Sequence, residues 1–138
     1  ALKRSRSSAT IAAHTMPPST PAARTTTTIA GDVWSADFPT TPNAFSRTPR
    51  SYPRYPDVFV ARLDRRQRGS AQLLYSSYLG GIHQDDATKV VSAHGLVTLA
   101  CFSSSPDFPT TVGSLAPVPP GGGDIAIVQL DTIFSRLV

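Results

Sequence analysis

The sequence predicts an all-β fold built from repeated four-stranded antiparallel sheets. All nine acidic residues are Asp and none is Glu, while Pro reaches 13 and Ser and Thr are abundant. Because Asp, Ser and Thr favour turns and caps whereas Glu favours helices, this balance disfavours long helices. In addition, the motif SADFPTT at residues 35–41 recurs as SPDFPTT at residues 105–111. The chain therefore resembles two copies of a turn-rich β unit.

The repeat extends beyond this motif. At the same separation of 70 residues, TIA at 28–30 aligns with TLA at 98–100. Farther on, DVFVARLD at 57–64 aligns with DIAIVQLD at 124–131, now at a separation of 67. The three-residue difference falls in the connection before this segment, where an exposed loop tolerates changes in length. Such self-similarity indicates a structural unit that is used twice.

Each unit is expected to form a four-stranded antiparallel meander. The segments are short, rich in β-branched and apolar residues, and bounded by turn residues. Strands are predicted at 26–33, 57–64 and 71–79 in the first copy, and at 87–93, 96–102 and 124–131 in the second. The first strand of copy one would fall within 10–18, and the fourth strand of copy two would begin within 134–138.

The best-defined strand, at 57–64, explains why a layered arrangement is expected. Its alternating side chains are largely apolar on both faces, with Arg62 as the exception, so sheets should cover it on both sides. Gly80 and Gly81 follow the strand at 71–79 and permit a tight turn with positive φ.

The chain divides into a basic N-terminal segment and two partial units. Residues 1–25 contain Lys and Arg but no acid, and offer few large apolar side chains to offset the entropy of ordering. We expect this Ser/Thr/Pro/Ala-rich segment to be mobile, although its composition also resembles an organellar transit peptide. The first unit spans residues 26–81, and the second spans 82–138 with its last strand truncated.

Cysteine content and hydropathy limit the classes of protein. Cys101 is the only cysteine, so no disulfide can form within the chain. No apolar run approaches the ~20 residues that span a bilayer, so membrane insertion is not expected.

Charge suggests one class of partner. The formal net charge is +4, and arginines cluster within residues 47–68. A polyanion could bind this segment, and its contacts would be Arg62, Arg65, Arg66 and Arg68. A solvated loop accounts for the same cluster without any partner and is favoured. We do not expect nucleic acid to be the partner.

The repeated motif offers acids at matching positions. Asp37 and Asp107 could act as catalytic acids or cation ligands. Alternatively, each accepts backbone N–H bonds in an Asx turn, while the next Phe inserts between units and the next Pro stiffens the exit. We favour this interpretation, because a turn-building residue present in every unit cannot be unique to one active centre. The structural repeat motif then comprises Asp37, Phe38, Pro39, Asp107, Phe108, Pro109, Asp57, Asp124, Gly80 and Gly81.

Other reactive residues lack a recognisable partner in the sequence. The cluster HQDD at 83–86 could contribute to a cation site, but two adjacent carboxylates fall short of a full shell, so a turn is favoured. Cys101 has no His partner in sequence. Trp34, Tyr52 and Tyr55 lie near arginines and could stack on bases or sugars, or simply pack against neighbouring segments. We assign no catalytic, cofactor-binding or metal-ligating residue.

The order of these motifs resembles a known family. LLYSSYLGG, an Asp-Asp turn, a short hairpin, SPDFPTT and GGGDIAIVQLD follow one another as in the bacterial seven-bladed β-propeller repeat (SBBP) family. The resemblance covers roughly residues 26–138. The chain departs from the family at ACF, residues 100–102, where a Gly-aromatic pair is usual, and in the arginine-rich insertion around 47–56.

The resemblance implies a fold and a role. The chain would hold about one and a half to two blades, whereas a closed propeller needs about four to eight. It would be a non-catalytic scaffold or binding module of a secreted or cell-surface bacterial protein. Its partners would be the remaining blades of the same chain or another protein, with a carbohydrate or polyanion as ligand. The alternative is a fragment of a propeller enzyme, a hydrolase or lyase, whose site lies in other blades.

Overall fold

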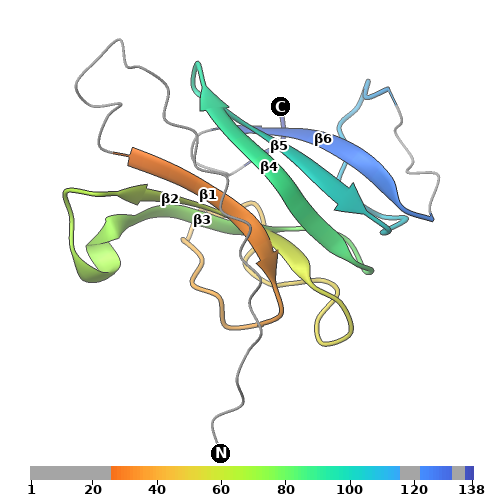
Figure 1. The fold of residues 1–138 in the computed structure, drawn as a ribbon, viewed down its shortest axis with the longest axis horizontal. Coiled ribbons are helices and arrows are strands. Elements are labelled where there is room, and N and C mark those ends of the chain that lie inside the picture. Colours follow the sequence, from red (N-terminus) through yellow and green to blue (C-terminus); the bar gives the residue numbers. More distant parts are fainter. Residues whose placement is uncertain (1–25, 116–121, 132–135) are drawn as a thin grey trace, which may run out of the picture.

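The structure, a computed structural model, describes residues 26–115, 122–131 and 136–138, and its regular elements are almost entirely strands (Figure 1). In chain order these are β1 (Thr26–Val33), β2 (Asp57–Asp64), the 3-10 helix η2 (Gly69–Gln72), β3 (Leu73–Leu79), β4 (Asp85–Ala93), β5 (Leu96–Ser103) and β6 (Asp124–Asp131). The predicted all-β class is confirmed. The segment 1–25, with its expected strand within 10–18, lies outside the described residues.

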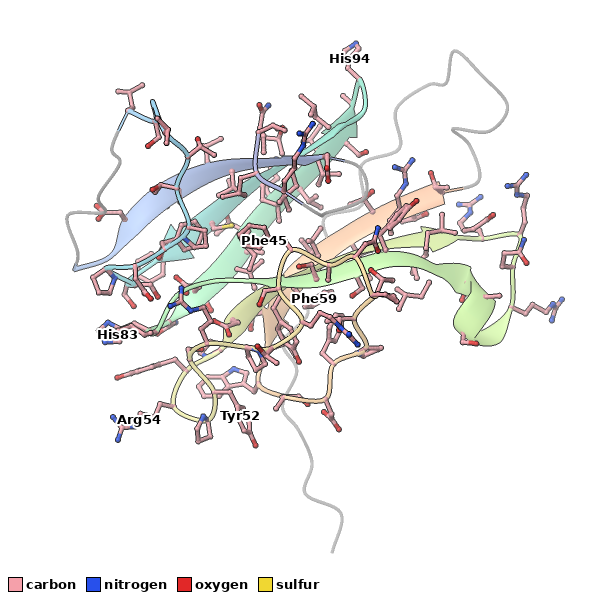
Figure 2. All side chains as sticks on the ribbon, turned by 180° about the vertical axis from the view of Figure 1, so that it is seen from behind. Phe45, Tyr52, Arg54, Phe59, His83 and His94 are labelled. Carbon is pink, nitrogen blue, oxygen red and sulfur yellow. The ribbon has the colours of Figure 1, made fainter. Side chains whose placement is uncertain are left out.

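The strands form two antiparallel sheets, ordered β1-β2-β3 and β4-β5-β6. The sheets lie against each other as two layers, with β4 next to β1 (Figure 1). A two-residue turn at His94 and Gly95 joins β4 to β5 (Figure 2). The predicted strands at 87–93 and 96–102 leave the same two residues between them. Both residues have positive φ, at 52° and 79°, which suits the twist of a tight hairpin.

The two copies of the repeat have the same strand register. In the first sheet Ala30 pairs with Val60, and in the second Ala100 pairs with Ile127. These are the residues that the sequence alignment places at equivalent positions. The repeat is therefore a structural unit, because a slip of one residue would have turned every side chain to the opposite face.

One apolar core joins the two sheets. Its first-sheet members come from all three strands: Ala30, Val58, Val60 and Leu79. The second sheet contributes Ala87, Val90, Val97, Leu99, Cys101, Val128 and Leu130, together with Phe108 from the loop after β5. Because each fully buried Val or Leu contributes about 1.5–3 kcal/mol, this shared core stabilises the pair of sheets.

Among the described residues, the outer face of the second sheet carries two exposed isoleucines. Val58 and Val60 are fully buried beneath the second sheet, whereas their counterparts Ile125 and Ile127 are each 68% exposed. The described residues give each sheet three strands rather than four, and the sheets do not close into a ring. The predicted four-stranded blade is thus seen only in part. No helix in the described part of the chain is long and apolar enough to cross a membrane.

Candidate functional site

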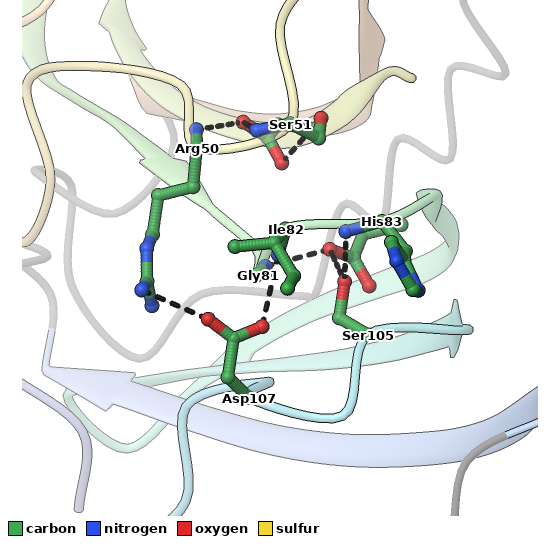
Figure 3. A network of polar contacts seen from close by, with 9 residues as sticks. Arg50, Ser51, Gly81, Ile82, His83, Ser105 and Asp107 are labelled. Carbon is green, nitrogen blue, oxygen red and sulfur yellow. Dashed lines mark hydrogen bonds and ion pairs between the residues drawn. The ribbon is translucent and has the colours of Figure 1, made fainter. Parts of the chain in front are cut away.

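The most extensive polar cluster surrounds Gly80 and Gly81, where β3 leads into β4 and the two sheets meet (Figure 3). We call this cluster the glycine corner. It contains these two glycines, three carboxylates and the groups that bind them. Its other members are Asp57, Asp85, Asp107, Arg50, Ser51, Ser103 and Ser105.

Asp85 is the central acceptor of the glycine corner and is fully buried. Its carboxylate accepts hydrogen bonds from Ser103 Oγ at 2.5 Å, from the Gly81 N–H at 2.7 Å and from Ser105 Oγ at 2.8 Å. Burial raises the pKa of Asp85, since desolvation of the charged form outweighs these three donors. The carboxylate thus links the β3–β4 connection to the loop after β5.

Asp57, at the start of β2, makes the equivalent link to the connection between β1 and β2. It accepts from the Arg50 N–H at 2.6 Å and from Ser51 Oγ at 3.1 Å. Its pKa is also raised, first by burial and further by the nearby charge of Asp85. Asp57 therefore holds the end of the β1–β2 connection in place, and it lies in a buried site close to Asp85.

Asp107 bridges the two sheets at the edge of the corner. One of its oxygens pairs with the Arg50 guanidinium at 2.8 Å, and the other accepts from the Ile82 N–H at 2.9 Å (Figure 3). Its neighbour Phe108 is buried in the core between the sheets. This half of the repeated motif ties the second copy to the first.

The first-copy motif is arranged differently. Asp37 is paired with the Ser35 hydroxyl in an exposed turn. Phe38 packs against Phe59 and Tyr78, with ring centroids 4.7 and 5.8 Å apart. The two Asp residues of the motif thus lie in separate turns and do not form a pair.

Gly80 and Gly81 are required for close packing rather than for an unusual backbone conformation. The pair permits a turn with positive φ, but neither Gly80 nor Gly81 has a positive φ in the structure. A Cβ on Gly80 would overlap Asp57 Oδ1 and lie 2.8 Å from Asp85 Oδ2. A Cβ on Gly81 would overlap Asp107 Oδ1 and lie 2.5 Å from Ser105 Cβ. Glycine is required because carboxylates crowd the backbone, rather than for its conformational freedom.

The predicted polyanion contacts are partly engaged by the fold. Arg62 donates a hydrogen bond to Thr26 Oγ1 across the β1–β2 pair. Arg66 donates one hydrogen bond to each carboxylate oxygen of Asp64, at 3.2 and 3.0 Å. The Arg66 hydrogen bonds lower the pKa of Asp64. Arg65 and Arg68 lie exposed in the turn after β2. Since Arg50 belongs to the glycine corner at the opposite end of β2, the arginine-rich segment does not form one continuous patch.

In the part of the chain that the structure describes, the other candidates include no nucleophile paired with a base. Cys101 is fully buried, and burial raises the pKa of its thiol to about 12, which keeps it protonated. Trp34, Tyr52 and Tyr55 are 40–49% exposed, and Tyr52 lies far out on the connection between β1 and β2 (Figure 2). The ring of Tyr55 contacts that of His83, with centroids 5.7 Å apart.

Only some residues of the predicted repeat motif lie in the glycine corner. Asp57, Gly80, Gly81 and Asp107 meet there, whereas Asp37 and Asp124 do not. Sequence reasoning missed Asp85 as the central buried acceptor, and it also missed Arg50 as the partner of Asp107. The Gly-Gly pair beside an Asp-rich segment was the available signal. Within the described residues, no group of three or more His, Cys or Asp side chains is placed to hold a metal ion.

The chemistry of the glycine corner is that of a structural joint. Its two buried carboxylates are occupied by backbone and hydroxyl donors, and only the edge acid Asp107 carries an ion pair. No protein-family model matches the sequence, and no curated protein matches it.

Proposed function

We propose that the chain is a non-catalytic β-propeller segment of the SBBP type, which serves as a scaffold or binding module of a secreted or cell-surface protein. The observation that carries the proposal is the unequal burial of equivalent side chains. Val58 and Val60 are buried by the next sheet, whereas Ile125 and Ile127 present the same face to solvent. A further sheet of the same kind would cover them as the second sheet covers the first.

The glycine corner supports the structural part of this proposal. It fixes one sheet against the next through Asp85 and Asp107, and donors from both sheets bind these carboxylates. A repeat array is stabilised by such interfaces between neighbours. An enzyme in which this corner held the catalytic groups would need at least one acid free to reach substrate.

A tandem protein tests the proposal. Two full copies of the chain joined head to tail should unfold at a higher denaturant concentration than one copy, because the first copy's Ile125 and Ile127 become buried. Full burial of two such side chains stabilises by about 3–6 kcal/mol before ordering costs. The matched control carries Ile125→Asp and Ile127→Asp in the first copy and should lose the gain. Equal midpoints for single and tandem proteins would refute the proposal.

A further inference from the structure

A groove of about 490 Å³ lies beside β6 on the edge that β5 does not cover. Its walls are the backbone and side chains of β6, the loop that follows the second DFPTT motif, and the last described residues. The residues that line the groove include Phe108, Thr111, Leu115, Ile127, Leu137 and Val138. The lining is mostly apolar, which suits an extended peptide whose polar groups pair with the strand edge.

The equivalent place in the first copy is filled by β3. There β3 lies between β2 and the loop after the first DFPTT motif. Thr41 of that loop donates its N–H to Ser76 O at 3.1 Å, and its hydroxyl accepts from the Ser76 N–H at 3.1 Å. Thr111 is the second-copy counterpart of Thr41 and lines the groove.

In the first copy, the hydroxyl of a β3 tyrosine also binds the loop that carries the DFPTT motif. Tyr78 Oη accepts from the Phe38 N–H at 3.0 Å and donates to Ser35 O at 2.7 Å. In the second copy the counterpart groups bond directly, from the Phe108 N–H to Ser105 O at 3.3 Å. The second loop therefore keeps the donor and acceptor that a tyrosine at this position would bridge.

One end of the groove already contains antiparallel backbone. Leu137 forms a bridge with Leu130, as Leu73 pairs with Leu63 in the first copy. The Val138 N–H donates to Gln129 O at 3.1 Å. A strand that continues in this direction would run along β6 as β3 runs along β2.

We propose that this groove binds an extended peptide of the Leu73–Leu79 type, LLYSSYL followed by Gly-Gly, in antiparallel pairing with β6, where the first residues of the peptide replace Leu137 and Val138. The inference rests on the proposed repeat architecture, and the groove shares Ile125 and Ile127 with the face that a further sheet would cover. The peptide would pair with the backbone edge of β6, whereas a further sheet would pack on the side chains of its outer face. The backbone of β6 supplies the pairing, and the tyrosine and final leucine of the peptide supply specificity. The groove is thus a site for strand addition.

The test is titration of the full chain with the synthetic peptide LLYSSYLGG, monitored by anisotropy of a fluorescent label and by amide NMR shifts. We expect saturable binding of one peptide per chain, with the largest shifts along β6. A peptide with Phe at the second tyrosine keeps the ring but loses the hydroxyl, and it should bind about fivefold more weakly. A scrambled peptide should not saturate.

A matched pair of protein variants locates the site. Leu115 and Val112 are both fully exposed in the same loop, but only Leu115 lines the groove. Phe45, the counterpart of Leu115, packs against the core to which Leu79 belongs. Leu115→Ala should therefore weaken peptide binding about three- to tenfold, whereas Val112→Ala should leave it unchanged. Neither substitution removes a buried side chain, so both variants should fold.

Equal binding of the designed and scrambled peptides would overturn the proposal, and so would equal losses in the two variants. A concentration-dependent dimer that excess peptide does not disperse would also overturn it, by assigning the groove to a second copy. If the tandem protein gains stability while the peptide fails to bind, only this inference is refuted. If the peptide binds while the tandem gains nothing, the groove stands and the proposed scaffold function is refuted.

Discussion

Replacement of Asp85 by Ala should be one of the most damaging polar substitutions in this protein. The carboxylate is fully buried and accepts from Ser103, Gly81 and Ser105. Asp86 provides the matched control, because it is adjacent and its one side-chain partner, Gln84, bonds to it at an exposed position. Asp86→Ala should change the free energy of unfolding very little, by less than about 0.5 kcal/mol.

The size of the loss follows from the three donors. A buried donor left without an acceptor costs about 1–3 kcal/mol. The two serine hydroxyls can rotate, and each already accepts a bond from a backbone N–H of Ser105 or His83. The Gly81 N–H is fixed and loses its acceptor. We therefore expect Asp85→Ala to lower the free energy of unfolding by about 2–4 kcal/mol.

The loss should also depend on pH with a defined sign. Burial raises the pKa of Asp85 in the folded protein above its unfolded value. A carboxyl of this kind contributes most below the unfolded pKa, and its contribution declines as pH rises through the folded pKa. The difference between wild type and Asp85→Ala should therefore be larger near about pH 3 than near about pH 7.

The assay is urea denaturation followed by far-ultraviolet circular dichroism at both pH values, with Asp86→Ala measured in parallel. A loss below about 0.5 kcal/mol for Asp85→Ala would refute the reasoning. So would a loss that grows as pH rises, because that result would mean that the ionised carboxylate is the favoured form in the folded protein.

Gly80→Ala should lower the free energy of unfolding by about 2 kcal/mol or more, because its Cβ would displace Asp57 and Asp85; a neutral result in urea denaturation would contradict this. Cys101 should react with a thiol reagent only when the chain unfolds, so rapid labelling without urea would count against its burial. If the arginine-rich segment binds a polyanion, heparin retention should fall with salt and with Arg65→Ser plus Arg68→Ser, whereas retention insensitive to both would exclude that partner.

Local sequence features predicted much of the fold. The short runs at residues 57–64 and 124–131, rich in β-branched and apolar residues, predicted two strands. In the structure both strands have the same register against the preceding strand, although the connections before them differ by three residues. The two-residue hairpin at His94 was also predicted. These features depend on short-range patterning, which a single sequence records directly.

The glycine corner depends on tertiary packing and was predicted less well. Nothing local distinguishes Asp85, which is fully buried, from Asp86, which is not. Their difference arises because the loop carrying Ser105 and Asp107 folds back over Gly81. The role of Gly80 could not be predicted for the same reason, because the carboxylates of Asp57 and Asp85 that crowd it come from other segments of the chain. A single sequence does not show which distant groups will meet.

In the described residues, β2 and β6 are equivalent strands of one repeat. β2 is paired along both edges, whereas the second edge of β6 is paired only at its end, where Leu130 bridges Leu137. Residue-resolved hydrogen exchange tests this central claim most directly. Because Gln129 O and the Asp131 N–H point to the groove edge, alternation places the amides of Ile125 and Ile127 there too. We predict that these two amides exchange rapidly while those of Ala126 and Val128 are protected, and that all amides of residues 58–62 are protected. Uniform protection along both strands, or an alternating pattern in β2, would contradict the claim.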